Sequence, residues 1–167
     1  MKKLIIACIL VCATYGIASA QDIKGYKVFS LGDDFEKVYT QVRETFSGID
    51  IATDGQPGGG TRLFVKTSTE SVGFYFNREY VLCRIVVETR IDDDYYSKLM
   101  EHIKQKYGAP KTESNTPSKP NVWSSGSRSL TVYTPFGKSV TVVYADLALQ
   151  EVDKKPFPPL RVDVKSY

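Results

Sequence analysis

The stretch DDFEKVYTQVRETFSG (residues 33–48) is followed about sixty residues later by a similar stretch, DDYYSKLMEHIKQKYG (residues 93–108). In both, apolar residues recur every three to four positions, which places one apolar stripe along a helix. The stripe of the first stretch consists of Phe35, Val38, Val42 and Phe46, and that of the second includes Leu99, Ile103 and Tyr107. The sequence therefore predicts two amphipathic helices that pack on a core.

The ends of both predicted helices carry the expected signals. Each begins with paired aspartates, at 33–34 and 93–94, which are good N-caps and whose charge suits a helix N-terminus. Each stops near a glycine, Gly48 or Gly108, where helices commonly end. Pro110 strengthens the second stop.

Segments with the alternation of β-strands follow each helix. Val72, Phe74 and Phe76 alternate with less apolar residues, as a half-buried strand requires. The strands predicted after the first helix span 61–67, 72–76 and 80–89. Those predicted after the second lie near 122–123 and span 129–134 and 139–144.

These elements predict an α+β fold built as a tandem repeat, in which each half is one helix followed by about three antiparallel strands. One helix on three strands leaves the sheet partly open, so the halves should pack as one domain over 21–153, with repeats of about 29–90 and 91–150. A chance likeness of two helix-plus-meander segments is the alternative.

The glycine-rich stretch 54–60 and the polar stretch 111–121 are expected as loops. Residues 154–167 form a proline-containing C-terminal tail, in which 160–164 have the pattern of an edge strand.

Residues 1–20 have the pattern of a cleavable signal peptide. Lys2 and Lys3 precede an uncharged apolar run, and Ala18-Ser19-Ala20 provides the small residues of a cleavage site. The run is shorter than the roughly 20 apolar residues of a membrane span. Neither Cys8 nor Cys12 combines a small preceding residue with a full-length apolar run, as a lipidation site requires, so no lipid anchor is expected. The protein is predicted to be exported, and periplasmic or secreted after cleavage near Ala20–Gln21.

Cleavage there would leave 147 of the 167 residues, enough for one domain with a real core. It would remove Lys2 and Lys3 and no acidic residue, which lowers the net charge from +3 to +1. A nearly neutral chain with interspersed charges favours neither nucleic acid nor an anionic membrane as a partner. No later stretch is long enough to span a membrane.

The sequence shows no pattern that carries catalysis or metal binding. The cysteine that remains after cleavage, Cys83, alternates with Val81, Ile85 and Val87 on one apolar face and is interpreted as a core residue. His102 is the only histidine and has no second ligand at zinc spacing. No catalytic residue, cofactor or metal is therefore predicted.

Three aromatic residues fall on the opposite side of the predicted strands from the core residues: Phe64, Tyr75 and Tyr133. If that side faces solvent, they form an aromatic surface of the kind enriched in protein interfaces. The alternative is that they pack against the other half or the tail.

The stretch FSLGDDFEKV (residues 29–38) resembles the opening of two families of exported bacterial proteins, the outer-membrane assembly lipoproteins of the SmpA/OmlA type and the secreted beta-lactamase inhibitor proteins. The second resemblance implies a tandem repeat of helix and antiparallel sheet with a concave binding surface. The chain lacks the lipidation site of the first family and the paired cysteines common in the second.

We therefore expect an exported, non-enzymatic binding or interaction domain of the bacterial cell envelope or exterior, inhibitor-like in its general activity. Its expected partner is another protein or an envelope component. The alternatives are an envelope hydrolase whose site no motif reveals, and an assembly or structural factor of the envelope.

Overall fold

The structure, a computed structural model, describes residues 22–56, 60–90, 94–114, 116, 118–135 and 138–154. The predicted signal peptide and residues 155–167 of the predicted tail, including the possible edge strand, lie outside the described residues. The helical elements are α1 (Phe35–Thr45), α2 (Tyr95–Tyr107), α3 (Leu147–Gln150) and the 3-10 turn η1 (Glu151–Lys154). The strands are β1 (Gly25–Tyr26), β2 (Phe29–Ser30), β3 (Ile51–Gly55), β4 (Thr61–Lys66), β5 (Glu70–Phe76), β6 (Leu82–Arg90), β7 (Asn121–Ser125), β8 (Arg128–Tyr133) and β9 (Ser139–Asp146).

The first helix begins and ends as its sequence predicts. Asp34 has an extended backbone, and its Oδ1 accepts a hydrogen bond from the backbone N–H of Lys37 at 2.9 Å, which caps the first turn. The helix ends at Thr45, and Gly48 follows with a φ of 79°. Val38 and Val42 are fully buried, so the predicted apolar stripe faces the core.

The start of the second helix differs from the prediction. Asp94 is its N-cap residue, but the Asp94 backbone is helical and its side chain makes no capping hydrogen bond. The carboxylate instead lies 3.6 Å from Lys98 Nζ, one turn along the helix. The prediction of a capping aspartate is therefore wrong for Asp94, and residues 92–93 lie outside the described residues. The helix ends at Tyr107 with Gly108 as its C-cap residue, close to the predicted stop.

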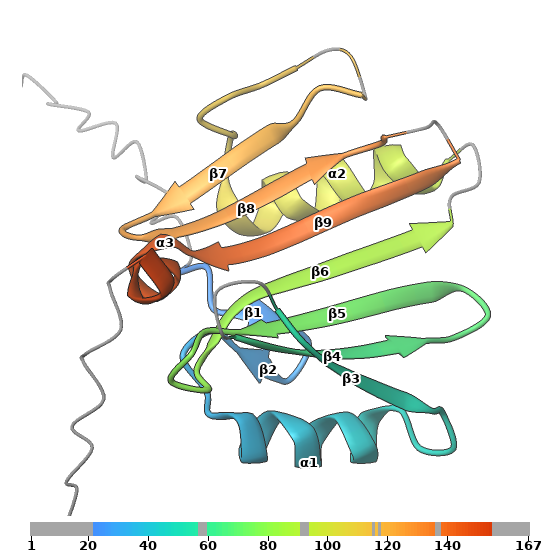
Figure 1. Cartoon of the computed structure of the whole chain (residues 1–167). Coiled ribbons are helices and arrows are strands. Elements are labelled where there is room, and N and C mark those ends of the chain that lie inside the picture. Colours follow the sequence, from blue (N-terminus) through green and yellow to red (C-terminus); the bar gives the residue numbers. More distant parts are fainter. Residues whose placement is uncertain are drawn as a thin grey trace, which may run out of the picture.

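Seven antiparallel strands form one continuous sheet in the order β3-β4-β5-β6-β9-β8-β7 (Figure 1). The strands that follow α1 make one half of the sheet and those that follow α2 make the other. The last strand of each half, β6 or β9, pairs with that of the other half at the centre of the sheet, with Val87 opposite Val142. The fold is thus α+β, as predicted.

Strand β3 occupies a region partly predicted as a loop. It pairs with β4 from Ile51 opposite Val65 to Gly55 opposite Thr61. Only Ile51 is half-buried, and the other four residues of β3 are exposed. An edge strand with so little buried surface has no apolar alternation, which is why the pattern analysis missed it.

Both helices cover the same face of the sheet. Val38 and Val42 of α1 and Ile103 and Tyr107 of α2 belong to one hydrophobic cluster with the inward side chains of the strands. In Figure 1, α2 lies behind β7–β9 and α1 lies beneath β3–β5. The small β1–β2 hairpin adds buried Phe29, whose ring lies 4.5 Å from that of Phe74. None of the described helices crosses the centre of the other face of the sheet (Figure 1).

A β-bulge changes the predicted alternation of β6. Phe76 of β5 lies opposite Leu82, but Tyr75 lies opposite Arg84, so Cys83 is an extra residue in β6. Leu82 therefore takes the core position, together with Ile85 and Val87 further along. Cys83 is buried, and its Sγ donates to the backbone oxygen of Tyr75 at 3.3 Å. The prediction that Cys83 shares one apolar face with Ile85 and Val87 is wrong, because the bulge intervenes.

Candidate binding face of the sheet

The strand register defines the sheet face that lies opposite the two long helices, which we call the open face. Because side chains alternate along each strand, every second residue points to this side. On β4 and β5 it carries Arg62, Phe64, Lys66, Ser71, Gly73 and Tyr75, and on β6, β9 and β8 it carries Arg84, Val86, Glu88, Thr141, Val143, Thr131 and Tyr133. Many of these side chains are only half-buried.

An apolar row crosses the middle of the open face. Phe64 lies opposite Gly73, Gly73 opposite Val86, and Val86 opposite Val143. Phe64, Val86 and Val143 are each half-buried. Four adjacent strands thus present a continuous apolar surface to solvent, and such patches commonly mark interaction sites.

Beside this row, two arginines flank Tyr75. The guanidinium carbon of Arg84 lies 4.1 Å from the centre of the Tyr75 ring, and that of Arg62 lies 5.9 Å from it. The ring also covers Gly73, since a β-carbon added there would come within 3.0 Å of a ring atom. Tyr75 is therefore held in place from three sides, which lowers the entropy that it would lose on binding a partner.

The two arginines differ in their ion pairing. Arg62 Nε donates a hydrogen bond to Asp54 Oδ1 at 3.0 Å. The hydrogen bond to Asp54, and to a smaller extent one to Tyr75, raises the pKa of Arg62 above its ordinary value. For Arg84, no carboxylate of the described chain lies within ion-pair distance. Arg84 therefore brings a positive charge, without a paired acid, to the centre of the open face.

Two further basic residues lie at one end of the open face. Lys66 and Arg90 line a polar hollow of about 380 Å³ together with Glu70, Glu88, Ser139 and the β4–β5 turn. Glu70 is already paired with Lys27 at 2.8 Å. Glu88 accepts a hydrogen bond from Ser139 Oγ at 3.1 Å. Neither Lys66 nor Arg90 forms an ion pair with another described residue. The open face consequently favours a partner with acidic groups.

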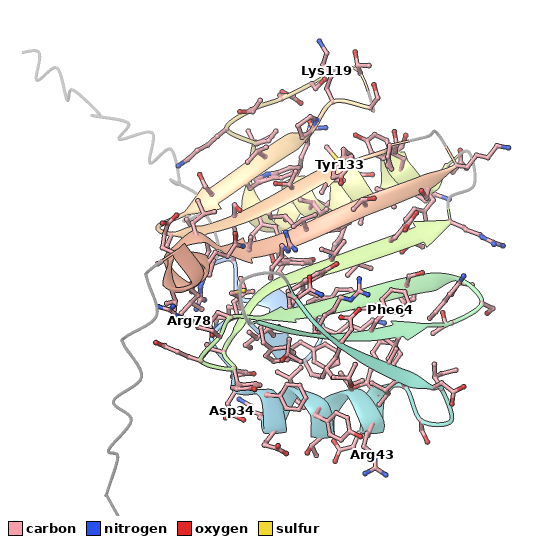
Figure 2. The ribbon with its side chains drawn as sticks, in the orientation of Figure 1. Asp34, Arg43, Phe64, Arg78, Lys119 and Tyr133 are labelled. Carbon is pink, nitrogen blue, oxygen red and sulfur yellow. The ribbon has the colours of Figure 1, made fainter. Side chains whose placement is uncertain are left out.

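The three residues predicted for a binding surface all lie on the open face, but not together. Phe64 and Tyr75 lie on neighbouring strands beside the Arg62 side chain. Tyr133 lies on β8, four strands from Phe64, and the two are well separated in Figure 2. The sequence analysis missed Arg62, Arg84, Val86 and Val143. Alternation with the inward residues Ile85 and Val87 indicates Arg84 and Val86, and alternation in β9 indicates Val143, but the pairing of Arg84 with Tyr75 depends on the strand register.

His102 is exposed on α2 and lines a cavity of about 220 Å³ on the helix-bearing side of the sheet. We call this the tyrosine cavity, because its lining includes Tyr26, Tyr95, Tyr107 and Tyr144.

Within the described ranges, no group of three or more His, Cys, Asp or Glu side chains could hold a metal ion. Among the described helices, none is both long and apolar enough to cross a membrane. No family model, curated protein or solved structure matches this chain.

Proposed function

We propose that this protein is an exported, non-enzymatic binding domain of the bacterial cell envelope or exterior, and that its open face docks a partner protein that presents apolar and acidic side chains. The observation that carries the proposal is the apolar row of Phe64, Val86 and Val143 beside the Arg62–Tyr75–Arg84 stack. Protein interfaces are enriched in tyrosine and arginine, and their energetic centres are desolvated aromatic and arginine side chains.

The charge distribution favours an acidic protein over nucleic acid as the partner of the open face. The whole chain has a net charge of only +3, and +1 after cleavage of the predicted signal peptide. Asp54 and Glu88 also lie on the open face, and both would repel phosphates. A polypeptide can match the apolar row with its own side chains and place carboxylates near Arg84, Lys66 and Arg90.

The proposed export rests on the sequence pattern of residues 1–20. The proposed tandem repeat is supported by the element order, because α1 precedes the meander β4-β5-β6 and α2 precedes the meander β7-β8-β9. The strand order β4-β5-β6-β9-β8-β7 runs symmetrically outward from the central β6–β9 pair. This arrangement would arise if two copies of one helix-plus-meander unit joined through their last strands.

The envelope hydrolase is the less favoured alternative. A hydrolase would require a polar pocket with a nucleophile next to His102 or to residues 92–94. The tyrosine cavity beside His102 is lined mainly by apolar and aromatic side chains, and its described lining residues include no serine or cysteine. An envelope assembly factor remains compatible with a docking face and would differ in the identity of the partner.

Site-specific photocrosslinking tests the docking proposal. A benzophenone amino acid at Val86 should crosslink one partner in the envelope fraction of the source cells, whereas the same group at exposed Glu36 of α1 should not. The partner, identified by mass spectrometry, is then purified and titrated. Val86→Asp should weaken binding at least tenfold, because it places a desolvated charge in the apolar row.

Val28→Asp is the matched control, since Val28 is 57% exposed on the β1–β2 hairpin and is not part of the open face. Higher salt should slow association, as expected for a basic face and an acidic partner. Equal affinities of the Val86→Asp and wild-type proteins for the purified partner would refute the proposal.

A further inference from the structure

The tyrosine cavity lies where the two halves of the sheet meet, on the side away from the open face. Its floor is formed by Val87 of β6 and Val142 of β9, which are direct neighbours in the sheet. Leu99 and Ile103 of α2 form one apolar wall. Tyr26 of the β1–β2 hairpin lies on the other side, so the cavity opens between the hairpin and α2.

The acidic group at this cavity already has partners. Glu70 Oε2 accepts a hydrogen bond from the Tyr26 hydroxyl at 2.8 Å, and its Oε1 lies 2.8 Å from Lys27 Nζ. Burial is the main cause that raises the pKa of Tyr26, and this hydrogen bond raises it further. The hydroxyl is therefore kept protonated. Glu70 therefore contributes little uncompensated negative charge to the cavity.

Two other groups at the cavity do not have such partners. Burial raises the pKa of Tyr144, so its hydroxyl remains a hydrogen-bond donor, and it has no hydrogen-bond partner in the described part of the chain. Lys106 is exposed on α2, and its Nζ lies 5.1 Å from the ring of Tyr107. No described carboxylate forms an ion pair with Lys106. Both Tyr144 and Lys106 line the tyrosine cavity and the adjoining hollow beside the hairpin.

An apolar floor and wall with a cationic rim match a ligand that is apolar at one end and anionic at the other. Apolar cavities with a few convergent polar groups are the usual form of small-molecule sites. A volume of about 220 Å³ restricts the buried part of the ligand to a single ring or a short chain. Hydrogen bonds from an ammonium to a carboxylate are among the strong ones in proteins.

We propose that the tyrosine cavity binds a small amphipathic carboxylate, with its aromatic or short acyl body against Val87, Val142 and Leu99 and its carboxylate on Lys106 and the Tyr144 hydroxyl. This site is separate from the open face and does not depend on the proposed docking function. His102 precedes Lys106 by one helical turn on the same rim.

Isothermal titration of the purified protein with 3-phenylpropionate tests the proposal. The acid should bind saturably, and its neutral amide, 3-phenylpropanamide, should bind at least tenfold more weakly because it lacks the charge that Lys106 recognises. Lys106→Met should weaken binding of the acid by a similar factor. Lys104→Met is the matched control, because Lys104 is on the opposite side of α2 and lies close to Glu113.

Leu99→Trp should abolish binding by filling the cavity while leaving the charges unchanged, with circular dichroism as the check on folding. The open-face variant Val86→Asp should bind the acid like the wild type, which separates this proposal from the docking proposal. No saturable binding of the acid, equal affinity for the amide, or equal losses in Lys106→Met and Lys104→Met would each overturn the assignment.

Discussion

Arg128 of β8 and Asp146 of β9 lie directly opposite each other in the sheet and form an ion pair, with Nε 3.1 Å from Oδ2. The Arg128 guanidinium also donates to the backbone oxygens of Ile23 at 3.4 Å and Leu31 at 3.1 Å. Asp146 Oδ1 accepts from the backbone N–H of Ala148 at 3.1 Å, at the start of α3. One ion pair thus joins the β1–β2 hairpin, the sheet and α3.

The first prediction concerns the pH dependence of this pair. Burial alone would raise the pKa of Asp146, but hydrogen bonds from Ser127 and Arg128 outweigh it and lower the pKa below its ordinary value of 3.8. A carboxyl whose pKa is lower in the folded state than in the unfolded state stabilises the fold at pH values above its unfolded-state pKa. This contribution is lost as the pH falls through its folded-state pKa. Asp146→Asn should therefore cost about 2 kcal/mol of unfolding free energy at pH 7.

Urea unfolding at several pH values checks this prediction. The difference between Asp146→Asn and the wild type should shrink as the pH falls below 3.8. Asp22→Asn is the control: Asp22 also pairs with Arg128, at 3.6 Å, but its side chain is 55% exposed. The control should change the unfolding free energy by less than about 0.5 kcal/mol. A stability difference for Asp146→Asn that stays constant between pH 7 and pH 2 would contradict the assigned role.

The second prediction compares the two helix starts, since Asp34 caps its helix and Asp94 does not. Asp34→Ala should reduce the unfolding free energy by about 1 kcal/mol, the usual cost of losing an N-cap side chain. Asp94→Ala should change it by less than about 0.5 kcal/mol, because it removes only an exposed pair with Lys98. Thermal or urea unfolding of the two variants measures the contrast, and equal losses would mean that both aspartates cap.

This contrast illustrates what the sequence does and does not determine. The stripes of both helices and the alternation of β4, β5, β8 and β9 are local patterns, so these elements were predictable. Whether Asp94 caps depends on its backbone angles, which its neighbours in sequence do not specify. The bulge at Cys83 depends on how β5 and β6 pair, and pairing is not visible in one strand.

The candidate binding face was predictable only in part for the same reason. Phe64 and Tyr75 could be assigned to the side away from the core by alternation. The position of Arg84 beside Tyr75 requires the register in which β5 and β6 pair, and the distance of Tyr133 from both requires the strand order. The tyrosine cavity combines residues of β1, β6, α2 and β9, and no local pattern links these elements.

The third prediction concerns Asn77, which is 1% exposed in the turn between β5 and β6. Its Oδ1 accepts hydrogen bonds from the backbone N–H groups of Glu79 and Val81, each at 3.0 Å. Its Nδ2 donates to the backbone oxygen of Leu149 at 3.1 Å, which ties α3 to the turn. Asn77→Ala should cost about 3 kcal/mol, because it leaves buried backbone groups unpaired.

Denaturant unfolding measures this loss, and Glu79→Ala is the control in the same turn. The Glu79 side chain is exposed, so its removal should change the unfolding free energy by less than about 0.5 kcal/mol. If Asn77→Ala were as stable as Glu79→Ala, the side chain would not be organising the turn.

The fourth prediction separates the structural role of Tyr75 from its proposed role in docking. Its ring covers Gly73 and stacks with Arg84, so Tyr75→Ala removes both contacts. An aromatic ring over a strand glycine and a cation–π contact each stabilise a sheet, and we expect a loss of about 1–2 kcal/mol. Tyr75→Phe should recover most of this loss, because the ring remains. Gly73→Ala should also destabilise the protein, since the added β-carbon would displace the ring.

Urea unfolding of the four variants Tyr75→Ala, Tyr75→Phe, Gly73→Ala and Tyr133→Ala tests this account. Tyr133 lies on the same open face but is not part of the Arg62–Tyr75–Arg84 stack, so Tyr133→Ala should cost less than Tyr75→Ala. If Tyr75→Phe were as unstable as Tyr75→Ala, the hydroxyl and not the ring would be the stabilising group. Because Tyr75→Phe should leave the fold intact, any loss of partner binding in that variant would report on docking through the hydroxyl and not on stability.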